Sequence, residues 1–151
     1  MARKCDACLV TCEDYRLHRR PDGRDLIGKF VMGLGCDCDV ITRAGSVQDL
    51  VRPQGDADRS LLRDLRISIE KHGVRTIYLI NHENCGAYAD LTFESREDEL
   101  AYHLKDLEHA ARTVQKAFPQ VRIVPLLAEL TDSEGDQDQF NQPARTPEKL
   151  A

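Results

Sequence analysis

The sequence lacks the features that would place a protein in a membrane or on a nucleic acid. No apolar run approaches the roughly 20 residues that a membrane-spanning helix needs. The apolar part of the basic N-terminus is too short for a signal peptide, so we expect a cytoplasmic protein. The net charge is −5, and no basic cluster lies outside residues 16–20. We therefore expect neither a nucleic acid nor a membrane as a partner.

What the sequence does contain is an ordinary globular composition with an unusual set of thiols. The chain has 151 residues, of which 41% are hydrophobic and 31% charged. This length favours one domain with a core that folds without disulfides or a metal. Six cysteines nonetheless occur, at positions 5, 8, 12, 36, 38 and 85. In a cytosolic protein of this size they indicate metal binding, catalysis or buried packing rather than disulfides.

Short apolar runs alternate along the chain with amphipathic helical patterns. The runs rich in strand formers are residues 7–12, 40–42, 76–80 and 121–127. The helical patterns cover residues 25–34, 56–72 and 95–118. This alternation predicts an α/β domain with an open, mainly parallel sheet of four to five strands and helices on both faces. Pro125 in the last strand indicates an edge position, because proline cannot donate to a ladder.

A histidine and a cysteine stand three residues apart in the segment INHENCGAY, just after the third predicted strand. His82 and Cys85 could bind one metal from a tight turn, or they could be a surface histidine beside a buried thiol. Cys12 ends the first predicted strand. Sites in parallel sheets lie beyond the carboxyl ends of strands where the strand order reverses, so these residues converge if the two strands are neighbours. Two cysteines and one histidine would leave the fourth zinc position open, as in catalytic sites.

Asp14 and Arg16 follow Cys12 at a spacing that allows an ion pair. Two residues apart in an extended stretch, their side chains point the same way. An arginine fork would orient the carboxylate, which could then accept a hydrogen bond from hydroxide on zinc or coordinate zinc directly. A surface ion pair of little energetic value explains the same spacing, and on these two residues alone it is the simpler interpretation.

Three motifs in order resemble those of the β-class carbonic anhydrases. Residues 12–16 match the family's Cys-x-Asp-x-Arg motif, and residues 82–86 match its His-x-x-Cys-Gly motif. Residues 37–45 are similar to the strand that ends in Arg-Asn-Ala-Gly, with Arg43 where the family often has asparagine. The resemblance spans roughly residues 7–90. It implies a β-carbonic anhydrase-like zinc domain over residues 1–131, and the polar residues 132–151 are expected to form a disordered tail.

The resemblance also implies an activity, a cofactor and an assembly. The protein would be a carbonate dehydratase that hydrates carbon dioxide to bicarbonate reversibly. Cys12, His82 and Cys85 would bind one Zn²⁺ per chain, which supplies hydroxide near neutral pH. Asp14 and Arg16 would orient that hydroxide. A homodimer or a higher homo-oligomer is the assembly that the resemblance implies.

Several alternatives stay open at the level of sequence. Relatives that hydrolyse carbon disulfide or carbonyl sulfide keep the same zinc ligands, so the ligands do not determine the substrate. A non-catalytic protein of the same fold would bind zinc without turnover. A thiol redox protein would depend on Cys5 and Cys8, although Cys8 falls inside a predicted strand. Together with Cys36 and Cys38 these thiols could also hold a second zinc, or all four could be buried or partly buried free thiols.

Overall fold

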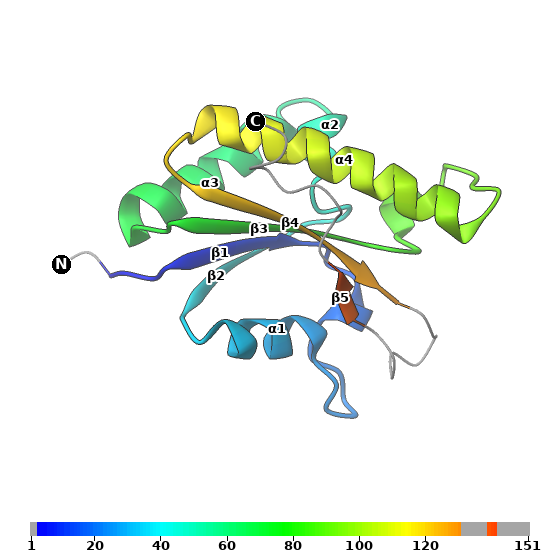
Figure 1. The fold of residues 1–151 in the computed structure, drawn as a ribbon, viewed down its shortest axis with the longest axis horizontal. Coiled ribbons are helices and arrows are strands. Elements are labelled where there is room, and N and C mark those ends of the chain that lie inside the picture. The colour runs from blue at the N-terminus through cyan, green and yellow to red at the C-terminus, as the bar shows by residue number, and fades with distance from the viewer. Residues whose placement is uncertain (1–2, 131–138, 142–151) are drawn as a thin grey trace.

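A central five-stranded sheet organises the molecule. The computed structural model describes residues 3–130 and 139–141. The strand order is β2-β1-β3-β4-β5 (Figure 1). The strands are β1 (Ala7–Thr11), β2 (Cys38–Thr42), β3 (Thr76–His82), β4 (Arg122–Glu129) and β5 (Gln139–Asn141). The first four run parallel, and β5 pairs antiparallel with β4.

Helices cover both faces of this sheet (Figure 1). One face carries α1 (Leu26–Leu34), and the other carries α2 (Gln48–Val51), α3 (Ala57–His72) and α4 (Arg96–Ala117). Two short 3₁₀ helices follow strand ends, η1 (Tyr15–Leu17) after β1 and η2 (Gly86–Tyr88) after β3. The α/β architecture expected from the sequence, an open and mainly parallel sheet between helices, is confirmed.

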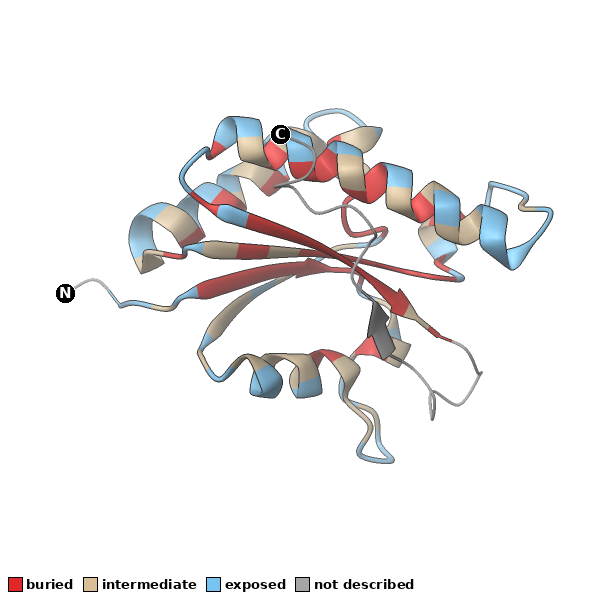
Figure 2. Cartoon of the chain, viewed as in Figure 1, coloured by how far each residue is buried: buried red, intermediate tan, exposed pale blue. Residues whose placement is uncertain are grey.

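The core has two layers, one on each side of the sheet. Strands β1, β3 and β4 are largely buried (Figure 2), because a parallel sheet covered on both faces exposes neither. Val10, Ile77 and Leu107 belong to the cluster between the sheet and helices α3 and α4. Leu9 and Ile80 belong to the cluster on the α1 side. Successive residues of β1 thus fill opposite layers, as strand alternation requires.

The helix ends follow local signals in the sequence. The Asp25 side chain accepts a hydrogen bond of 2.8 Å from the Gly28 N–H and so caps α1, and Ser95 caps α4 in the same way. Gly35 and Gly73 end α1 and α3 in the left-handed conformation, with φ of 70° and 73°. These residues explain why the helix boundaries agree with the sequence pattern.

The sheet order creates the switch point on which the site depends. From β1 the chain crosses to β2 at one edge, and it then returns to β3 on the other side of β1. Strands β1 and β3 are paired, with Val10 opposite Leu79. Their carboxyl ends, which lead directly to Cys12 and His82, therefore lie side by side where the order reverses.

The last strands refine two predictions. Pro125 pairs with Leu79 of β3, while β5 pairs only with residues 127–129 of β4. β4 is therefore not the edge strand of the sheet, because β5 pairs with its carboxyl end. At Pro125 itself, however, no described strand pairs with β4 on the side away from β3, as the proline predicted. Strand β5 lies within the predicted tail of residues 132–151, whose other residues fall outside the described part. No helix in the described ranges is both long and apolar enough to span a bilayer.

Candidate metal centre

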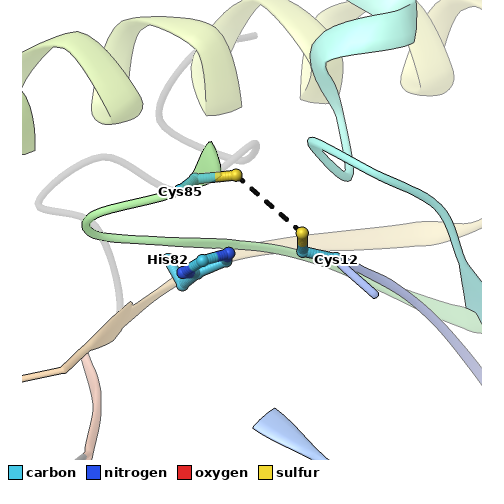
Figure 3. Close-up of side chains that lie close together, drawn as sticks. All are labelled: Cys12, His82 and Cys85. Atoms are coloured by element: carbon cyan, nitrogen blue, oxygen red, sulfur yellow. Dashed lines mark hydrogen bonds between the residues drawn. The ribbon is translucent and has the colours of Figure 1, made fainter. Parts of the chain in front are cut away.

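Three metal-competent side chains converge at the switch point. Cys12 follows β1 directly, His82 ends β3, and Cys85 lies in the turn before η2 (Figure 3). Their ligand atoms all lie within 4.8 Å of one another. The side chains are buried, at 4%, 1% and 5% exposure. The interpretation of His82 as a surface histidine is therefore wrong, and the predicted convergence of the three side chains is confirmed.

The two thiols stand at the separation that a tetrahedral zinc site requires. The Cys12 Sγ and Cys85 Sγ atoms are 3.8 Å apart, and neither cysteine forms a disulfide. Two zinc–sulfur bonds of about 2.3 Å at the tetrahedral angle place their sulfurs about 3.8 Å apart. The pair is thus already spaced for one shared metal ion.

His82 is oriented with one ring nitrogen available. Its Nδ1 lies 2.9 Å from the Glu83 carbonyl oxygen, so Nδ1–H donates there and Nε2 carries the lone pair. The Nε2 atom is buried and has no hydrogen-bond partner within residues 3–130 and 139–141. A buried polar atom without a partner is costly, and a metal ion would satisfy it. Histidine ligands of metals commonly donate their other N–H to a carbonyl in this manner.

The surroundings of the thiols favour negative charge at the cluster. Hydrogen bonding from the Cys85 thiol, followed by contributions from His82 and the Gly45 backbone N–H, lowers the pKa of Cys12. The pKa of Cys85 is raised, first by its hydrogen bond to Cys12 and then by burial. The backbone N–H groups of Ala87 and Tyr88 act in the opposite direction on Cys85. The contact between the two thiols therefore shifts their pKa values in opposite directions.

Asp14 and Arg16 form a built ion pair beside the cluster. The Arg16 Nε and Nη2 atoms donate to the two oxygens of Asp14 at 3.0 and 2.8 Å, and the Arg16 backbone N–H adds a bond of 2.9 Å. Burial alone would raise the pKa of Asp14, but these hydrogen bonds outweigh it and lower the pKa. The side chains are only 14% and 15% exposed, so this is no freely solvated surface pair. Asp14 Oδ2 lies 3.9 Å from His82 Nε2.

The loop after β2 brings the backbone N–H of Gly45 near the cluster. A backbone group of this kind has no side-chain signal in the sequence. Gly45 has φ of 79°, and a Cβ there would lie 2.9 Å from the Ala87 Cβ. Glycine at this position lets the loop approach η2 closely, and the Gly45 backbone N–H helps to lower the pKa of Cys12. Ser46 fixes the same loop by donating to the Val10 carbonyl at 3.3 Å.

Arg43 serves the helices rather than the cluster. It pairs with Asp49 at 3.2 Å and donates to the Ala57 carbonyl at 3.4 Å. Arg43 therefore contacts α2 and the start of α3.

A small cavity reaches the cluster at Cys85. Its volume is about 270 Å³, and its lining includes the apolar side chains of Leu91 and Phe93 beside Tyr88 and Glu99. The lining is thus partly polar and partly apolar, and a cavity of this size admits a small molecule.

A buried polar network holds Asn81, which precedes His82, and Tyr88, which follows Cys85. Asn81 donates at 3.1 Å to both the Tyr88 hydroxyl and the His103 Nδ1. The Tyr88 hydroxyl donates to Asp106 at 2.7 Å, and Arg52 holds that carboxylate with bonds of 3.0 and 2.6 Å. This network ties η2 and β3 to α4, and it lay outside the sequence prediction because its members are scattered along the chain.

We expect His103 to make the fold sensitive to mild acid. Burial, with a smaller contribution from His82, lowers its pKa to about 4, although Asp106 opposes the shift. Between pH 6.5 and 4 the unfolded chain binds a proton at this position and the folded chain does not. Stability from this residue is therefore full above pH 6.5 and falls as the pH drops, by up to about 3 kcal/mol. Urea unfolding at several pH values measures this slope.

His103→Gln separates this contribution from that of the carboxylates. The Gln side-chain oxygen can still accept from Asn81, but the side chain does not titrate. The variant should show a flatter slope between pH 4 and 6.5, whereas His109→Gln, at an exposed position of the same helix, should match the wild type. Equal slopes in wild type and His103→Gln would contradict the account.

The chain is similar in sequence to a family and to two proteins from rickettsiae. The family model described as "Putative carbonic anhydrase" matches residues 2–133. An uncharacterized protein of Rickettsia bellii is 29% identical over 124 residues, which cover 79% of this chain and 73% of the relative. An uncharacterized protein of Rickettsia conorii is 28% identical over 124 residues. That match covers 79% of this chain and 64% of the relative, so the chain spans less than two thirds of it.

Solved structures with the same fold include several carbonic anhydrases. A tetrameric β-carbonic anhydrase of Sordaria macrospora gives a TM-score of 0.62 at 11% identity, covering 95% of this chain and 82% of its own. A carbonic anhydrase from Glaciozyma antarctica gives 0.57 at 17% identity, covering 95% and 85%. The apo form of carbon disulfide hydrolase gives 0.50 at 15% identity, covering 95% and 81%. At these identities the likeness establishes the fold alone, and it confirms the fold that the three motifs predicted.

Proposed function

The chain belongs to the β-class carbonic anhydrase family as a short, divergent member, and we propose that it is a zinc-dependent carbonate dehydratase interconverting carbon dioxide and bicarbonate. The observation that carries the proposal is the buried cluster of Cys12, His82 and Cys85. Its sulfurs are spaced as a tetrahedral zinc site requires, and the His82 Nε2 atom has no hydrogen-bond partner among the described residues. One Zn²⁺ per chain on these three residues would leave the fourth position open.

The donor set suits zinc and the chemistry of hydration. Two thiolate sulfurs and one neutral imidazole nitrogen are ligands that zinc favours. Bound zinc would lower the pKa of a water molecule to about 7 and so supply hydroxide at neutral pH. The cavity that Cys85 lines would give a small substrate a route toward the cluster.

In this proposal Asp14 and Arg16 aim the nucleophile. Asp14 is held ionised by Arg16, so its carboxylate accepts a hydrogen bond from the nucleophile's O–H and turns the oxygen lone pair toward the substrate carbon. That oxygen bonds to the carbon while one carbon–oxygen π bond opens, and the product is bicarbonate. Arg16 also donates to the Asn84 carbonyl at 2.9 Å, which joins the dyad to the turn between His82 and Cys85.

Arg16→Lys tests the need for the fork. A lysine cannot hold both oxygens of Asp14 and the Asn84 carbonyl at once, so the carboxylate should lose its fixed orientation. We expect kcat/KM to fall roughly 10- to 100-fold with zinc content unchanged. Arg19→Lys, at an exposed position of the same segment, is the control and should retain full activity. An Arg16→Lys enzyme with unaltered kcat/KM would refute the role given to this arginine.

A related hydrolysis is the alternative function. The structural likeness to carbon disulfide hydrolase supports it, since that protein shares the fold. Zinc-loaded protein should be assayed with carbon dioxide, carbonyl sulfide and carbon disulfide side by side. The proposal expects the highest kcat/KM with carbon dioxide, and a preference for either sulfur compound would replace it by the alternative.

We propose further that the protein acts in the cytoplasm as a homodimer or a larger homo-oligomer. The likeness to tetrameric β-carbonic anhydrases supports an assembly. The zinc domain would comprise residues 1–131, followed by a C-terminal tail. Sedimentation velocity of the zinc-loaded protein gives the assembly directly.

A further inference from the structure

A second cluster of metal-competent side chains lies at the opposite end of the sheet. Cys5 precedes the amino end of β1, Asp39 lies in β2, and His72 is the last residue of α3. Their ligand atoms all lie within 4.8 Å of one another, and all three residues are partly buried. Cys12 follows the other end of β1, so the two clusters share no residue.

This cluster differs from the four-thiol site considered from the sequence. Strand alternation sends Cys8 into the core on the α3 side, whereas Cys38 packs against the core on the α1 side. Among the described residues the four thiols form no common cluster, so that alternative is wrong in its ligand set. Asp39, next to Cys38, faces the α3 side instead and meets Cys5 and His72.

One backbone hydrogen bond and one contact between side chains hold the three residues together. The Cys5 N–H donates to the His72 carbonyl at 3.0 Å, which joins the segment before β1 to the end of α3. His72 Nδ1 and Asp39 Oδ2 are 2.7 Å apart. Burial, and then the nearby Asp39 carboxylate, raise the pKa of Cys5. The Asp39 carboxylate close to the Cys5 sulfur favours a cation at this place.

We propose that Cys5, Asp39 and His72 form a second site for a thiophilic divalent cation, with Zn²⁺ as the fitting ion. Thiolate, imidazole and carboxylate are all zinc ligands, and a thiolate ligand disfavours Mg²⁺ and Ca²⁺. One thiolate and one carboxylate balance the two positive charges of the ion. Binding displaces the Cys5 thiol proton to solvent, and water completes the coordination on the exposed side.

The role of this site is structural. Its ligands come from the segment before β1, from the edge strand β2 and from the end of α3. An ion bound to all three would fasten the chain start to the sheet edge, far from the hydration chemistry. The site is therefore independent of the proposed function.

Zinc content per chain tests the proposal. Wild-type protein loaded with Zn²⁺ and desalted should hold about two ions per chain, and Cys5→Ser should hold about one. Cys36→Ser removes a partly buried thiol outside both clusters and should still hold two. Asp39→Asn keeps the shape of the side chain and should weaken the second ion at least about tenfold, which tests the site should Cys5→Ser fail to fold.

Cobalt distinguishes the two sites. In a Cys12→Ser/Cys85→Ser protein, Co²⁺ should still give a sulfur-to-cobalt charge-transfer band, and the further change Cys5→Ser should abolish it. Wild-type protein with one zinc ion that Cys5→Ser leaves in place would overturn the second site. If wild-type protein holds one ion and Cys5→Ser removes it, the second site is supported and the proposed function is contradicted. Failure of the second site and failure of the proposed function therefore give different results.

Discussion

Replacing Cys85 by serine is expected to release the zinc ion of the Cys12–His82–Cys85 cluster and to reduce carbon dioxide hydration to the background rate. A serine hydroxyl does not ionise near neutral pH, so the ion would keep one thiolate and one imidazole. Removing a group that only hydrogen-bonds a ligand lowers metal affinity by about 10- to 100-fold. Because Cys85 is itself a proposed ligand, we expect zinc affinity at this cluster to fall by more than about 100-fold. Zinc content after desalting and stopped-flow hydration measure the two effects.

The controls for Cys85→Ser separate loss of the ion from loss of the fold. Cys36→Ser removes a thiol outside the cluster and should keep both zinc at this cluster and activity. Circular dichroism should show the wild-type secondary structure in both variants, because a domain of this length forms its hydrophobic core without the metal. A Cys85→Ser protein that retains its zinc and its turnover would rule out the ligand assignment.

Replacing Asp14 by alanine or asparagine is expected to lower kcat/KM about 100-fold or more while zinc stays bound. Both variants remove the carboxylate that accepts the hydrogen bond from the nucleophile, and both leave the three proposed ligands unsubstituted. Asparagine keeps the size of the side chain, so its effect isolates the charge. Metal analysis and stopped-flow hydration of the same samples show whether activity falls with the ion in place.

The chain carries its own matched control for Asp14. Asp22 and Arg24 repeat the Asp-x-Arg spacing, with bonds of 3.1 Å from the Arg24 backbone N–H and 2.9 Å from its Nε. This pair lies away from the cluster, and Asp22 is 50% exposed. Asp22→Asn should therefore leave kcat/KM unchanged. Equal losses in Asp14→Asn and Asp22→Asn would point to a general effect on folding rather than to an oriented nucleophile.

The repeated Asp-x-Arg spacing shows where sequence reasoning stops. Local patterns predicted β1 to β4, the helices α1, α3 and α4 and their ends, because capping residues and apolar periodicity act over a few positions. They also predicted the convergence of Cys12 and His82, on condition that β1 and β3 are neighbours. The short elements α2 and β5 were not predicted. The spacing alone does not distinguish Asp14 from Asp22. Cys12 and the motif that it begins single out Asp14 in the sequence, and the structure adds that Asp14 and Arg16 are largely buried whereas Asp22 is half exposed.

The remaining features depend on contacts between distant segments. The effect of the Gly45 backbone N–H on the pKa of Cys12 comes from a backbone group, which carries no mark in the sequence beyond the glycine itself. Cys5, Asp39 and His72 are separated by more than thirty residues at each step, so no spacing motif joins them. Their meeting follows from the pairing of β1 with β2 and from the place where α3 ends.

Stopped-flow hydration of carbon dioxide by zinc-loaded wild type and Asp14→Ala, at neutral and alkaline pH, tests the central claim most directly. We predict turnover by the wild type at both pH values and its near-complete loss in Asp14→Ala, with equal zinc in both proteins. Turnover by the wild type at alkaline pH alone would mean that Asp14 closes the fourth zinc position at rest. Absence of turnover at either pH, with zinc bound, would contradict the assignment of this chain as a carbonate dehydratase.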